Sequence, residues 1–567
     1  MLFDILGTVL DNRGIKDAER FLKPSASDVI HYSNLKNIER AVELFIRHTG
    51  RNSTIVVLID SDADGYCSGA MMVMYIRKNF PDVKVIYLLH ERRENGLTKD
   101  MMEKLNKDLP DLLILPDSGT NNFEELSYLS SKGVDVIITD HHTAEGESEC
   151  ENVATINPQL CLDTYPNENL AAGGITYKFL QALDEHYGIR DADSYLDLVA
   201  ISAIADSMTI TEPETNFYVR EGLKRFVNPF FKELAKKHAE WAKEIYPEIV
   251  SWNLVNRLNA CIRVGDMHDK TTTFRALLGE VDTQTRISKY RGKEREVTET
   301  LQEQAVRLCE NARNRQNNRK KKLIEEAEMK IAEERLDKNA FIILTLDEVP
   351  SGFSGLIAGS MTSLYYRPAL VLSKEDGNDF YTGSLRGFEG HEVSEVKTFL
   401  ESLELFELVA GHEGAAGLRI SESNLKILNS TINSKLNFTH SEQMIPVDFE
   451  AHFRTVNEGL CRELDSIEKY FCKGFDSPLF AIKDVEIDCS DIQFKGTTKF
   501  LVNDVEYISF DINKELQSLA EEGKAVVCDV IGTIGINRYR GNECGQVKIT
   551  AIDIKQVKDK PAFTFEF

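Results

Sequence analysis

Residues 55–65 of this 567-residue chain read Ile-Val-Val-Leu-Ile-Asp-Ser-Asp-Ala-Asp-Gly. The β-branched and aliphatic run predicts a buried strand, and Gly65 followed by small residues suits a tight turn into a helix. Three carboxylates, on Asp60, Asp62 and Asp64, follow at alternate positions. Because carboxylates this close repel one another unless a cation lies among them, the stretch predicts a metal site at the carboxyl end of a parallel strand.

Two other interpretations of this stretch are an EF-hand loop and a solvated acidic turn. An EF-hand also begins D-x-D-x-D-G, but it requires a bidentate Glu at the twelfth position, which is Met71 here. An apolar strand also precedes the loop, where an EF-hand has a helix. The acidic turn without a metal remains open from this stretch alone.

Four more apolar runs follow, at residues 83–89, 112–117, 134–140 and 153–157, mostly separated by helical stretches. Strands that alternate with helices predict βαβ units and a mainly parallel sheet with both faces covered. In such sheets the reactive groups lie beyond the carboxyl ends of the strands. Residues 1–50, before the first strand, are predicted to be helical.

Residue types that bind metals end three of these runs. Besides the first acidic stretch, the third run ends in Asp117 and the fourth in Asp140-His141-His142. The carboxyl ends of parallel strands face one edge of the sheet, so we expect these side chains to converge. Asp206 ends a long apolar helix, where it is either a structural cap or another ligand.

Length and charge bound the class of protein. A chain this long is expected to contain three or four domains. The net charge of −25 argues against indiscriminate nucleic-acid binding, so a nucleic-acid site requires locally clustered cations. Such clusters occur at residues 286–295 and 313–322. Ten scattered cysteines, no apolar run of membrane-spanning length and no signal-like start predict a cytoplasmic protein without a membrane segment.

The second half of the chain divides into four segments that differ in sequence pattern. Residues 279–297 are expected to form a basic loop. Residues 300–337 lack Gly and Pro and predict one helix of roughly 55 Å, polar all round at its middle, which is typical of a helix that bridges domains. Residues 338–435 predict a smaller α/β unit. Residues 436–567 predict a five-stranded OB-type β-barrel.

The strands of that barrel are expected at residues 479–488, 498–510, 526–534 and 545–554, with a helix at 514–522. OB barrels commonly bind single strands, and Tyr539 in a basic hairpin is a candidate for stacking a base.

Two glycine-rich pieces in residues 338–435 contain candidate ligand-binding side chains. Ser384 and Arg386 follow Gly383, and His412 follows Gly411. Glycines let a ligand approach the backbone closely, although two turns with buried polar caps would have the same composition.

These motifs resemble those of the DHH phosphoesterase superfamily, and the resemblance extends over nearly the whole chain to RecJ-type single-strand-DNA-specific exonucleases. The specific part is the acidic stretch with Asp117, Asp140-His141-His142 and Asp206. Residues 157–158, 172–174 and 257–266 are weaker matches. The resemblance implies an N-terminal helical segment (1–50), a parallel-sheet DHH domain (51–299), a connecting helix (300–337), an α/β DHH-associated domain (338–435) and an OB-type nucleic-acid-binding domain (436–567).

The resemblance also implies roles. Two Mn²⁺ or Mg²⁺ ions would be bound by Asp62 and Asp64 on different ions, by Asp117 as a bridge and by His141 and Asp206. His142 would face the scissile phosphate, and Asp60 and Asp140 would orient the ligands.

A terminal phosphate would be held by Arg263, Ser384 and Arg386, together with Arg92 or Arg93. His412 belongs to the same implied substrate site. The chain departs from the family pattern at Ile59, Gly387 and Ala410, which affects the substrate details more than the catalysis.

The implied function is a 5′-3′ exonuclease that degrades single-stranded DNA to mononucleotides in DNA repair and recombination, as a monomer that binds single-stranded DNA and a single-strand-binding protein or helicase. One alternative is a DHH phosphodiesterase acting on short oligonucleotides or cyclic dinucleotides. The other is a non-catalytic DHH scaffold protein, which predicts missing ligands.

Overall fold

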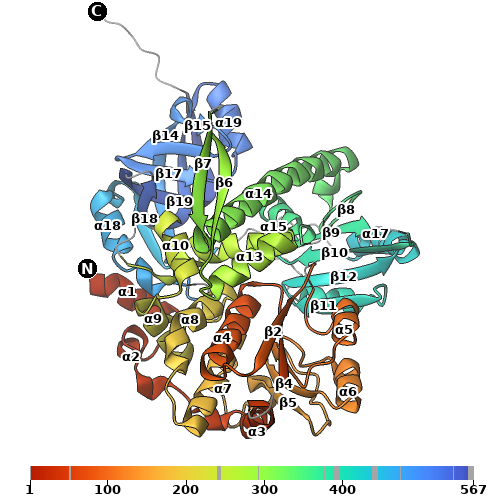
Figure 1. Cartoon of the computed structure of the whole chain (residues 1–567). Helices are drawn as coiled ribbons and strands as arrows, with labels where there is room; N and C mark the ends of the chain where they lie inside the picture. The colour runs from red at the N-terminus through yellow and green to blue at the C-terminus, as the bar shows by residue number, and fades with distance from the viewer. Residues whose placement is uncertain are drawn as a thin grey trace, which may run out of the picture.

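The computed structural model describes residues 2–559 except 50–52, 93, 239–243, 291–292, 351, 376, 389–392, 394, 437–444, 473 and 540–541. Its first lobe is built on a five-stranded sheet in the order β2-β1-β3-β4-β5 (Figure 1). Every neighbouring pair is parallel, as the alternation of strands and helices predicts. The strands are β1 (Thr54–Ile59), β2 (Lys84–Leu89), β3 (Leu112–Pro116), β4 (Asp135–Thr139) and β5 (Val153–Ile156).

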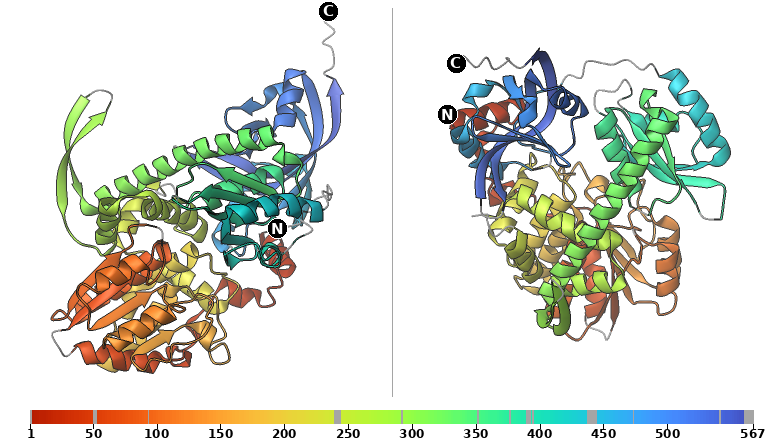
Figure 2. Two further views of the ribbon diagram at one scale, coloured as in Figure 1. Left: turned by 90° about the vertical axis from the view of Figure 1, so that its right-hand side faces the viewer. Right: turned by 90° about the horizontal axis from the view of Figure 1, so that it is seen from above.

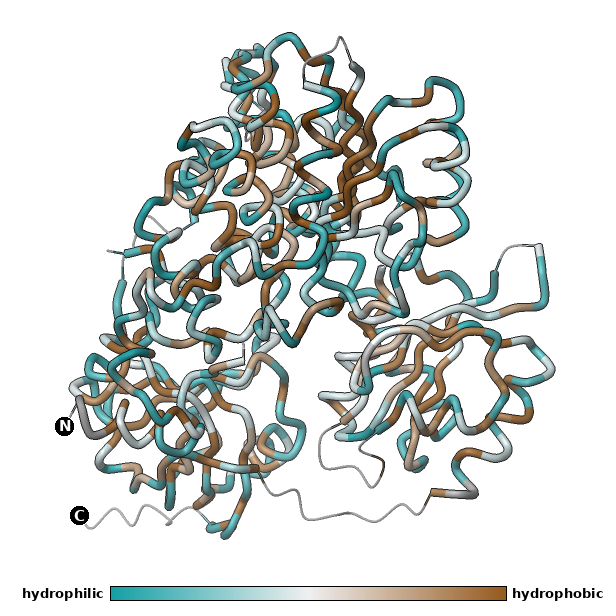
Figure 3. Tube along the Cα trace, turned by 90° about the horizontal axis from the view of Figure 1, so that it is seen from below, coloured by the Kyte–Doolittle hydropathy of each residue, from teal (hydrophilic) through white to brown (hydrophobic). Residues whose placement is uncertain are grey.

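Both faces of this sheet are covered. Along β1, Ile55, Val57 and Ile59 belong to one apolar core, and Val56 and Leu58 belong to another. Figure 3 shows the adjoining strands as a compact brown group within the lobe. The helices around the sheet are α3 (Ile38–Thr49), α4 (Ala63–Asn79), α5 (Lys99–Leu105), α6 (Phe123–Ser131) and α7 (Ala172–Tyr187).

The lobe is extended by helices on both sides of this unit. Before the sheet lie α1 (Leu2–Asn12) and α2 (Ala18–Leu22). After α7 follow α8 (Leu196–Ala205), α9 (Pro213–Lys224), α10 (Pro229–His238), α11 (Pro247–Ile249), the π-helix η5 (Val250–Val255), α12 (Asn256–Val264) and α13 (Met267–Leu277).

The loop expected at residues 279–297 is instead an antiparallel hairpin of β6 (Thr283–Tyr290) and β7 (Lys293–Thr300). Figure 2 shows it projecting from the body of the molecule. At its base, Glu299 accepts from Arg286 at 2.6 Å and from Arg307 at 2.9 Å. The prediction was wrong because charged residues occupy both faces, so no alternation of apolar and polar residues marks the strands.

The long polar segment forms α14 (Leu301–Glu334), about 50 Å at 1.5 Å per residue. A capping box starts it: Glu303 N donates to Thr300 Oγ1 at 3.2 Å, and Thr300 N donates to the Glu303 carboxylate at 2.8 Å. The helix contacts α12 and α13 of the first lobe and α15 of the second, so it bridges the two lobes.

The second lobe has one mixed sheet in the order β11-β12-β10-β9-β8. Only β8 and β9 pair in parallel. Its elements are β8 (Ile342–Leu346), α15 (Ser354–Tyr365), β9 (Ala369–Lys374), β10 (Phe380–Arg386), α16 (Val396–Glu401), β11 (Leu408–His412), β12 (Ala415–Ser421) and α17 (Glu422–Lys435).

The last region was predicted to be a five-stranded barrel, but it is a seven-stranded sheet in the order β13-β14-β18-β19-β17-β16-β15. The sheet curls so that β14 also contacts β16. Residues 498–510 are two strands and not one. Asn503 and Asp504 both adopt left-handed φ angles, of +51° and +61°, and so form a tight hairpin turn. The elements are β13 (Phe449–His452), α18 (Glu458–Asp465), β14 (Phe480–Asp488), β15 (Gln493–Phe494), β16 (Thr498–Val502), β17 (Val505–Ser509), α19 (Lys514–Glu521), β18 (Lys524–Tyr539) and β19 (Asn542–Asp559).

The three regions are not packed equally. One continuous apolar core joins the first lobe to the C-terminal sheet and includes Ile59 and Val547 alike. Across this junction Arg13 pairs with Asp448 at 3.0 Å. The second lobe has its own cores, one of which takes in Leu323 and Ala327 of α14.

A buried ion pair ties α7 to its surroundings. Lys178 Nζ lies 2.6 Å from Glu214 Oε1, and the side chains are 0% and 2% exposed. Glu214 also accepts from the Tyr165 hydroxyl at 2.8 Å and from Ile30 N at 3.1 Å. This network positions α7, the helix whose first amides enter the site described below.

Replacing Lys178 with Met should destabilise the first lobe by about 3–5 kcal/mol, because Glu214 would remain buried without its cation. Chemical denaturation followed by circular dichroism measures this loss. The control is Lys224→Met, since Lys224 pairs with Glu221 at a side-chain exposure of 68% and its loss should cost about 0.5 kcal/mol or less. Equal losses in the two variants would contradict a special role for the buried pair.

Candidate metal centre

The carboxyl edge of the first sheet gathers acidic and imidazole groups from separate segments. His141 Nε2 lies 3.3 Å from Asp117 Oδ1, 3.3 Å from Asp206 Oδ2 and 3.8 Å from Asp64 Oδ2. One ligand atom from each of Asp60, Asp62 and Asp117 also fits within 4.8 Å of the others. The residues predicted to bind metal therefore form one connected cluster.

Asp117 occupies an unusual backbone conformation. It follows β3 directly and adopts a left-handed φ of +67°, while its N–H still donates to Thr139 O of β4 at 2.9 Å. Aspartate tolerates this region better than most residues, but it is sparsely populated and such outliers concentrate at functional sites. The turn buries the carboxylate among the other acidic tips, where the side chain is 2% exposed.

Asp64 is held by the start of α7. Its carboxylate accepts from Ala172 N at 2.9 Å, from Gly173 N at 3.0 Å and from the Ser202 hydroxyl. The first amides of a helix lack partners inside the helix, and the helix dipole favours a negative charge there. The fold thus fixes this carboxylate with donors from two helices, α7 and α8.

The acidic loop itself is fixed at both sides. Asp62 caps α4 by accepting from Gly65 N at 3.0 Å, and Asn259 of α12 accepts from Ala63 N at 3.0 Å. Asp60 accepts from Gly96 N at 3.1 Å, which ties the loop after β2 to the site.

Asp140 accepts hydrogen bonds from both histidines and from a threonine. It accepts from His142 Nδ1 at 2.7 Å, from His141 N at 2.8 Å and from Thr120 Oγ1 at 2.7 Å. Burial alone would raise the pKa of Asp140, but the hydrogen bond and charge of His142, with those of its other partners, hold it below its ordinary value. The same hydrogen bond raises the pKa of His142 to about 9. His142 keeps half of its side chain exposed, so it faces the open side of the site.

The pKa values of the other carboxyl groups are shifted upward instead. Burial, followed by the charges of neighbouring aspartates, raises the pKa of Asp117 and of Asp60 well above the ordinary value. Burial raises the pKa of Asp206 to about 7, against the opposing charge of His141. A cation among these groups would remove the repulsion.

The cluster fits hard divalent cations. Asp117 Oδ1 and Asp60 Oδ2 are buried and accept no hydrogen bond from any described residue. Oxygen-rich ligands with one imidazole suit Mn²⁺ or Mg²⁺. The residues present thus match the chemistry of such ions, with acceptor atoms left over to bind them.

The residues proposed to hold a terminal phosphate come from both lobes. Ser384 Oγ is 2.9 Å from Ser354 Oγ at the start of α15. Arg386 packs its guanidinium over Gly355, where an added Cβ would lie 2.7 Å from Nη2. Both side chains lie on one face of β10, next to a helix N-terminus.

The remaining predicted contacts are spread more widely. Arg92 is exposed in the loop after β2, and Arg263 lies near the end of α12. Arg93 lies outside the described residues, as do the side chains of His412 and Tyr539. Arg538, beside Tyr539, pairs with Asp465 at 2.5 Å and 2.6 Å, so its guanidinium already has a partner within the protein.

Three residues important for the site were not identified from the sequence. Ser202 bonds Asp64, Thr120 bonds Asp140, and the buried Lys270 donates to His90 O at 3.1 Å and Glu91 O at 2.7 Å. Ser202 follows Asp64 by 138 positions, and Lys270 follows His90 by 180. Only a polar residue within an apolar helix hinted at Ser202, and no local pattern marked the others.

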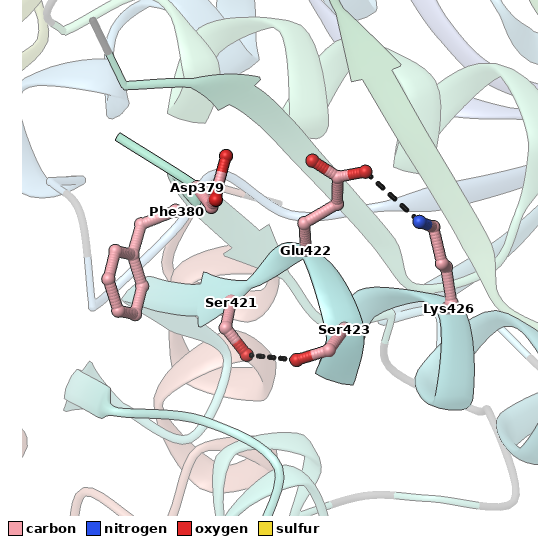
Figure 4. A pocket seen from close by; sticks show the side chains of 6 residues that line it. All are labelled: Asp379, Phe380, Ser421, Glu422, Ser423 and Lys426. Carbon is pink, nitrogen blue, oxygen red and sulfur yellow. Dashed lines mark hydrogen bonds and ion pairs between the residues drawn. The ribbon is translucent and has the colours of Figure 1, made fainter. Parts of the chain in front are cut away.

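A surface pocket of about 300 Å³ lies elsewhere, on the second lobe (Figure 4). It is lined by Asp379, Phe380, Ser421, Glu422, Ser423 and Lys426. Lys426 pairs with Glu422 at 3.0 Å within it. Phe380 starts the strand that Arg386 ends, so along the strand this lining residue is about 13 Å from Ser384 and about 20 Å from Arg386.

Comparison with known proteins gives matches over the whole chain. The DHH family, N-terminal domain, matches residues 54–203, and the RecJ OB domain matches residues 447–551. The prophage-derived protein YorK of Bacillus subtilis, provisionally named a single-strand DNA-specific exonuclease, is 34% identical over 98% of this chain and 97% of its own. The single-stranded-DNA-specific exonuclease RecJ of Haemophilus influenzae is 26% identical over 97% and 96%.

Solved structures give the same fold. RecJ of Thermus thermophilus in complex with Mn²⁺ superposes with a TM-score of 0.68 at 19% identity, covering 98% of this chain and 76% of that one. Among the described helices, none combines the length and the apolar character needed to cross a membrane.

Changing Gly173 to Ala should weaken Mn²⁺ binding by roughly 10- to 100-fold, the usual effect of losing an interaction that orients a ligand. The added Cβ would lie 2.3 Å from Ser202 Oγ and so displace the hydroxyl from Asp64. Calorimetric titration with Mn²⁺ measures the change. The control is Gly7→Ala in α1, where the Cβ meets nothing within 4 Å. Unchanged affinity in the Gly173 variant would show that Asp64 does not need this support.

Proposed function

Because this chain belongs to the RecJ-type family of DHH exonucleases, we propose that it hydrolyses single-stranded DNA from the 5′ end to mononucleotides, with two Mn²⁺ or Mg²⁺ ions. The observation that supports this most is the convergence of Asp64, Asp117 and Asp206 within 3.8 Å of one imidazole nitrogen, that of His141. We also propose that it acts in DNA repair or recombination. The intact ligand set argues against a non-catalytic scaffold.

In this proposal Asp62, Asp64, Asp117, His141 and Asp206 would hold the two ions. Such a pair of ions, when bound, activates water and stabilises the leaving oxygen in an in-line displacement. The amides of Ala172 and Gly173 keep Asp64 oriented, and Asp140 keeps both histidine backbones in place.

His142 supplies the positive charge that faces the substrate. Its Nδ1 is held by Asp140, so Nε2 is left to donate to a non-bridging phosphate oxygen. The hydrogen bond to Asp140 raises the pKa of this imidazole to about 9, which favours its protonated form. In this proposal the charged ring faces the phosphate.

The second lobe is proposed to set the 5′-to-3′ direction of cleavage. Ser384 and Arg386, beside the first amides of α15, offer a hydroxyl, a guanidinium fork and a helix N-terminus to a terminal phosphate. Arg263 and Arg92 would add charge from the first lobe. An enzyme that grips the 5′ phosphate and cuts one nucleotide further along releases mononucleotides.

Replacing Asp117 with Ala or Asn should lower single-strand cleavage by several orders of magnitude while leaving binding of the strand measurable. Asn keeps the tolerance for the left-handed backbone, so it separates the loss of a ligand from backbone strain. Gel analysis of the cleavage products and fluorescence anisotropy measure the two properties.

The control for this experiment is Asp135→Asn. Asp135 belongs to the same sheet but begins β4 at the opposite edge, where it pairs with His48 at 2.8 Å. Its replacement should leave cleavage intact. Retained cleavage in the Asp117 variants would refute the two-metal proposal.

Replacing Arg386 with Gln should reduce kcat/KM by roughly 10- to 100-fold on 5′-phosphorylated strands, the range expected for lost hydrogen bonds to a charged group. On 5′-hydroxyl strands it should have little effect. Lys426→Gln, in the pocket of Figure 4, removes a cation from the same lobe and should change neither substrate. An equal loss on both strands would place the 5′ clamp elsewhere.

A further inference from the structure

An exposed tryptophan lies on the helix that leads into the metal centre. Trp252 is 65% exposed, far more than is usual for this residue type. It lies in η5, a π-helix that continues directly into α12. π-helices are rare and frequently occur at functional sites.

The position of Trp252 on the helix connects it to the site. Asn256, Asn259 and Arg263 follow at spacings of four, three and four residues, and all are at least partly exposed, whereas Leu254, Val255 and Leu258 are buried. These spacings place the four side chains along one side of the helix. Asn259 already binds the acidic loop through Ala63 N, about 10 Å of helix from Trp252.

The segment just before this stripe contacts the C-terminal region. Tyr246 donates to Glu468 at 2.8 Å, and Glu248 pairs with Lys548 of β19 at 3.4 Å. Trp252 therefore lies between the contacts with the OB-type sheet and the metal centre.

The helix α14, which contains the basic residues 313–322, contacts α12. Arg257 bonds Asn253 O at 2.8 Å and Glu310 of α14 at 2.5 Å. One turn of α14 after Glu310, the half-buried Arg313 donates to the uncharged Gln316 at 2.9 Å. Lys320 follows two turns after Arg313. Arg313 and Lys320 are seven positions apart on α14, so they lie on the same side of this helix about 10 Å apart, and both are partly exposed.

We propose that Trp252 is a stacking platform for a base of single-stranded DNA, with Arg313 and Lys320 holding the backbone beside it. An exposed aromatic ring for a base, combined with cations for the backbone, is what binds single strands without sequence preference. This inference rests on the proposed function, because it assigns a path to the strand whose 5′ end lies at the metal centre. In this proposal the two nucleotides of a dinucleotide occupy the metal centre and leave the ring without a base.

Fluorescence tests the contact directly. The chain has two tryptophans, and Trp241→Phe leaves Trp252 as the sole tryptophan, which is excited selectively at a wavelength that tyrosine does not absorb. In metal-free buffer, which prevents cleavage, a 16-nucleotide oligo(dT) should quench this emission and a dinucleotide should not. Emission unchanged by the 16-mer would overturn the proposal.

Substitution tests what the contact contributes. Trp252→Ala should raise KM and Kd for the 16-mer by roughly 5- to 150-fold, the range for one lost stacked base, with kcat unchanged. Trp252→Phe should restore most of the affinity, and Tyr128→Ala, an exposed aromatic on α6, should change nothing. Cleavage of the dinucleotide should be the same in all variants.

The two proposals fail in different ways. Quenching without any cleavage in Mn²⁺ would reject the nuclease and leave the stacking site in place. Cleavage with an unaltered Kd in Trp252→Ala would reject the stacking site alone. An equal loss on the dinucleotide and the 16-mer would show that the substitution acts through α12, and it would also reject the stacking site.

Discussion

Repulsion among buried carboxylates is the constraint on which this structure depends. Asp60, Asp64 and Asp117 lie at one sheet edge, where burial and mutual charge raise their pKa values. Peptide amides from elsewhere partly offset that cost, with Gly96 N on Asp60 and the first amides of α7 on Asp64. Because these donors are backbone groups, the cluster exists only when the sheet, the β2 loop and α7 are all in place. Fold and site are therefore specified together.

The packing divides the residues of the proposed function between two units with separate cores. The acidic cluster belongs to a lobe that shares one apolar core with the OB-type sheet, so the proposed cleavage site and this sheet are packed together. The clamp residues Ser384 and Arg386 belong to a lobe whose cores are separate and which is joined through α14. The proposed recognition of the strand end would thus depend on the bridging helix.

The parts of this structure that could be predicted are those specified locally. Apolar runs ending in Asp117 and Asp140 predicted both the parallel strands and the shared edge, because strand direction decides where a terminal residue lies. The hairpin at 283–300 was missed because its charges follow no alternation, and the turn at Asn503 because two adjacent non-glycine residues with left-handed φ are rare. Ser202 and Lys270 act across more than a hundred residues, a distance that no local pattern reports.

Net charge also restricts how such a protein can hold DNA. At −25, the chain attracts a polyanion poorly from a distance, and salt screens what attraction remains beyond about 8 Å. Several arginines near the proposed path are already paired, such as Arg315 with Asp269 and Arg538 with Asp465. Fewer cations remain for phosphates than the clusters in the sequence suggest. Short-range contacts must then supply the affinity, and stacking on an aromatic ring is one that neither the net charge nor added salt removes.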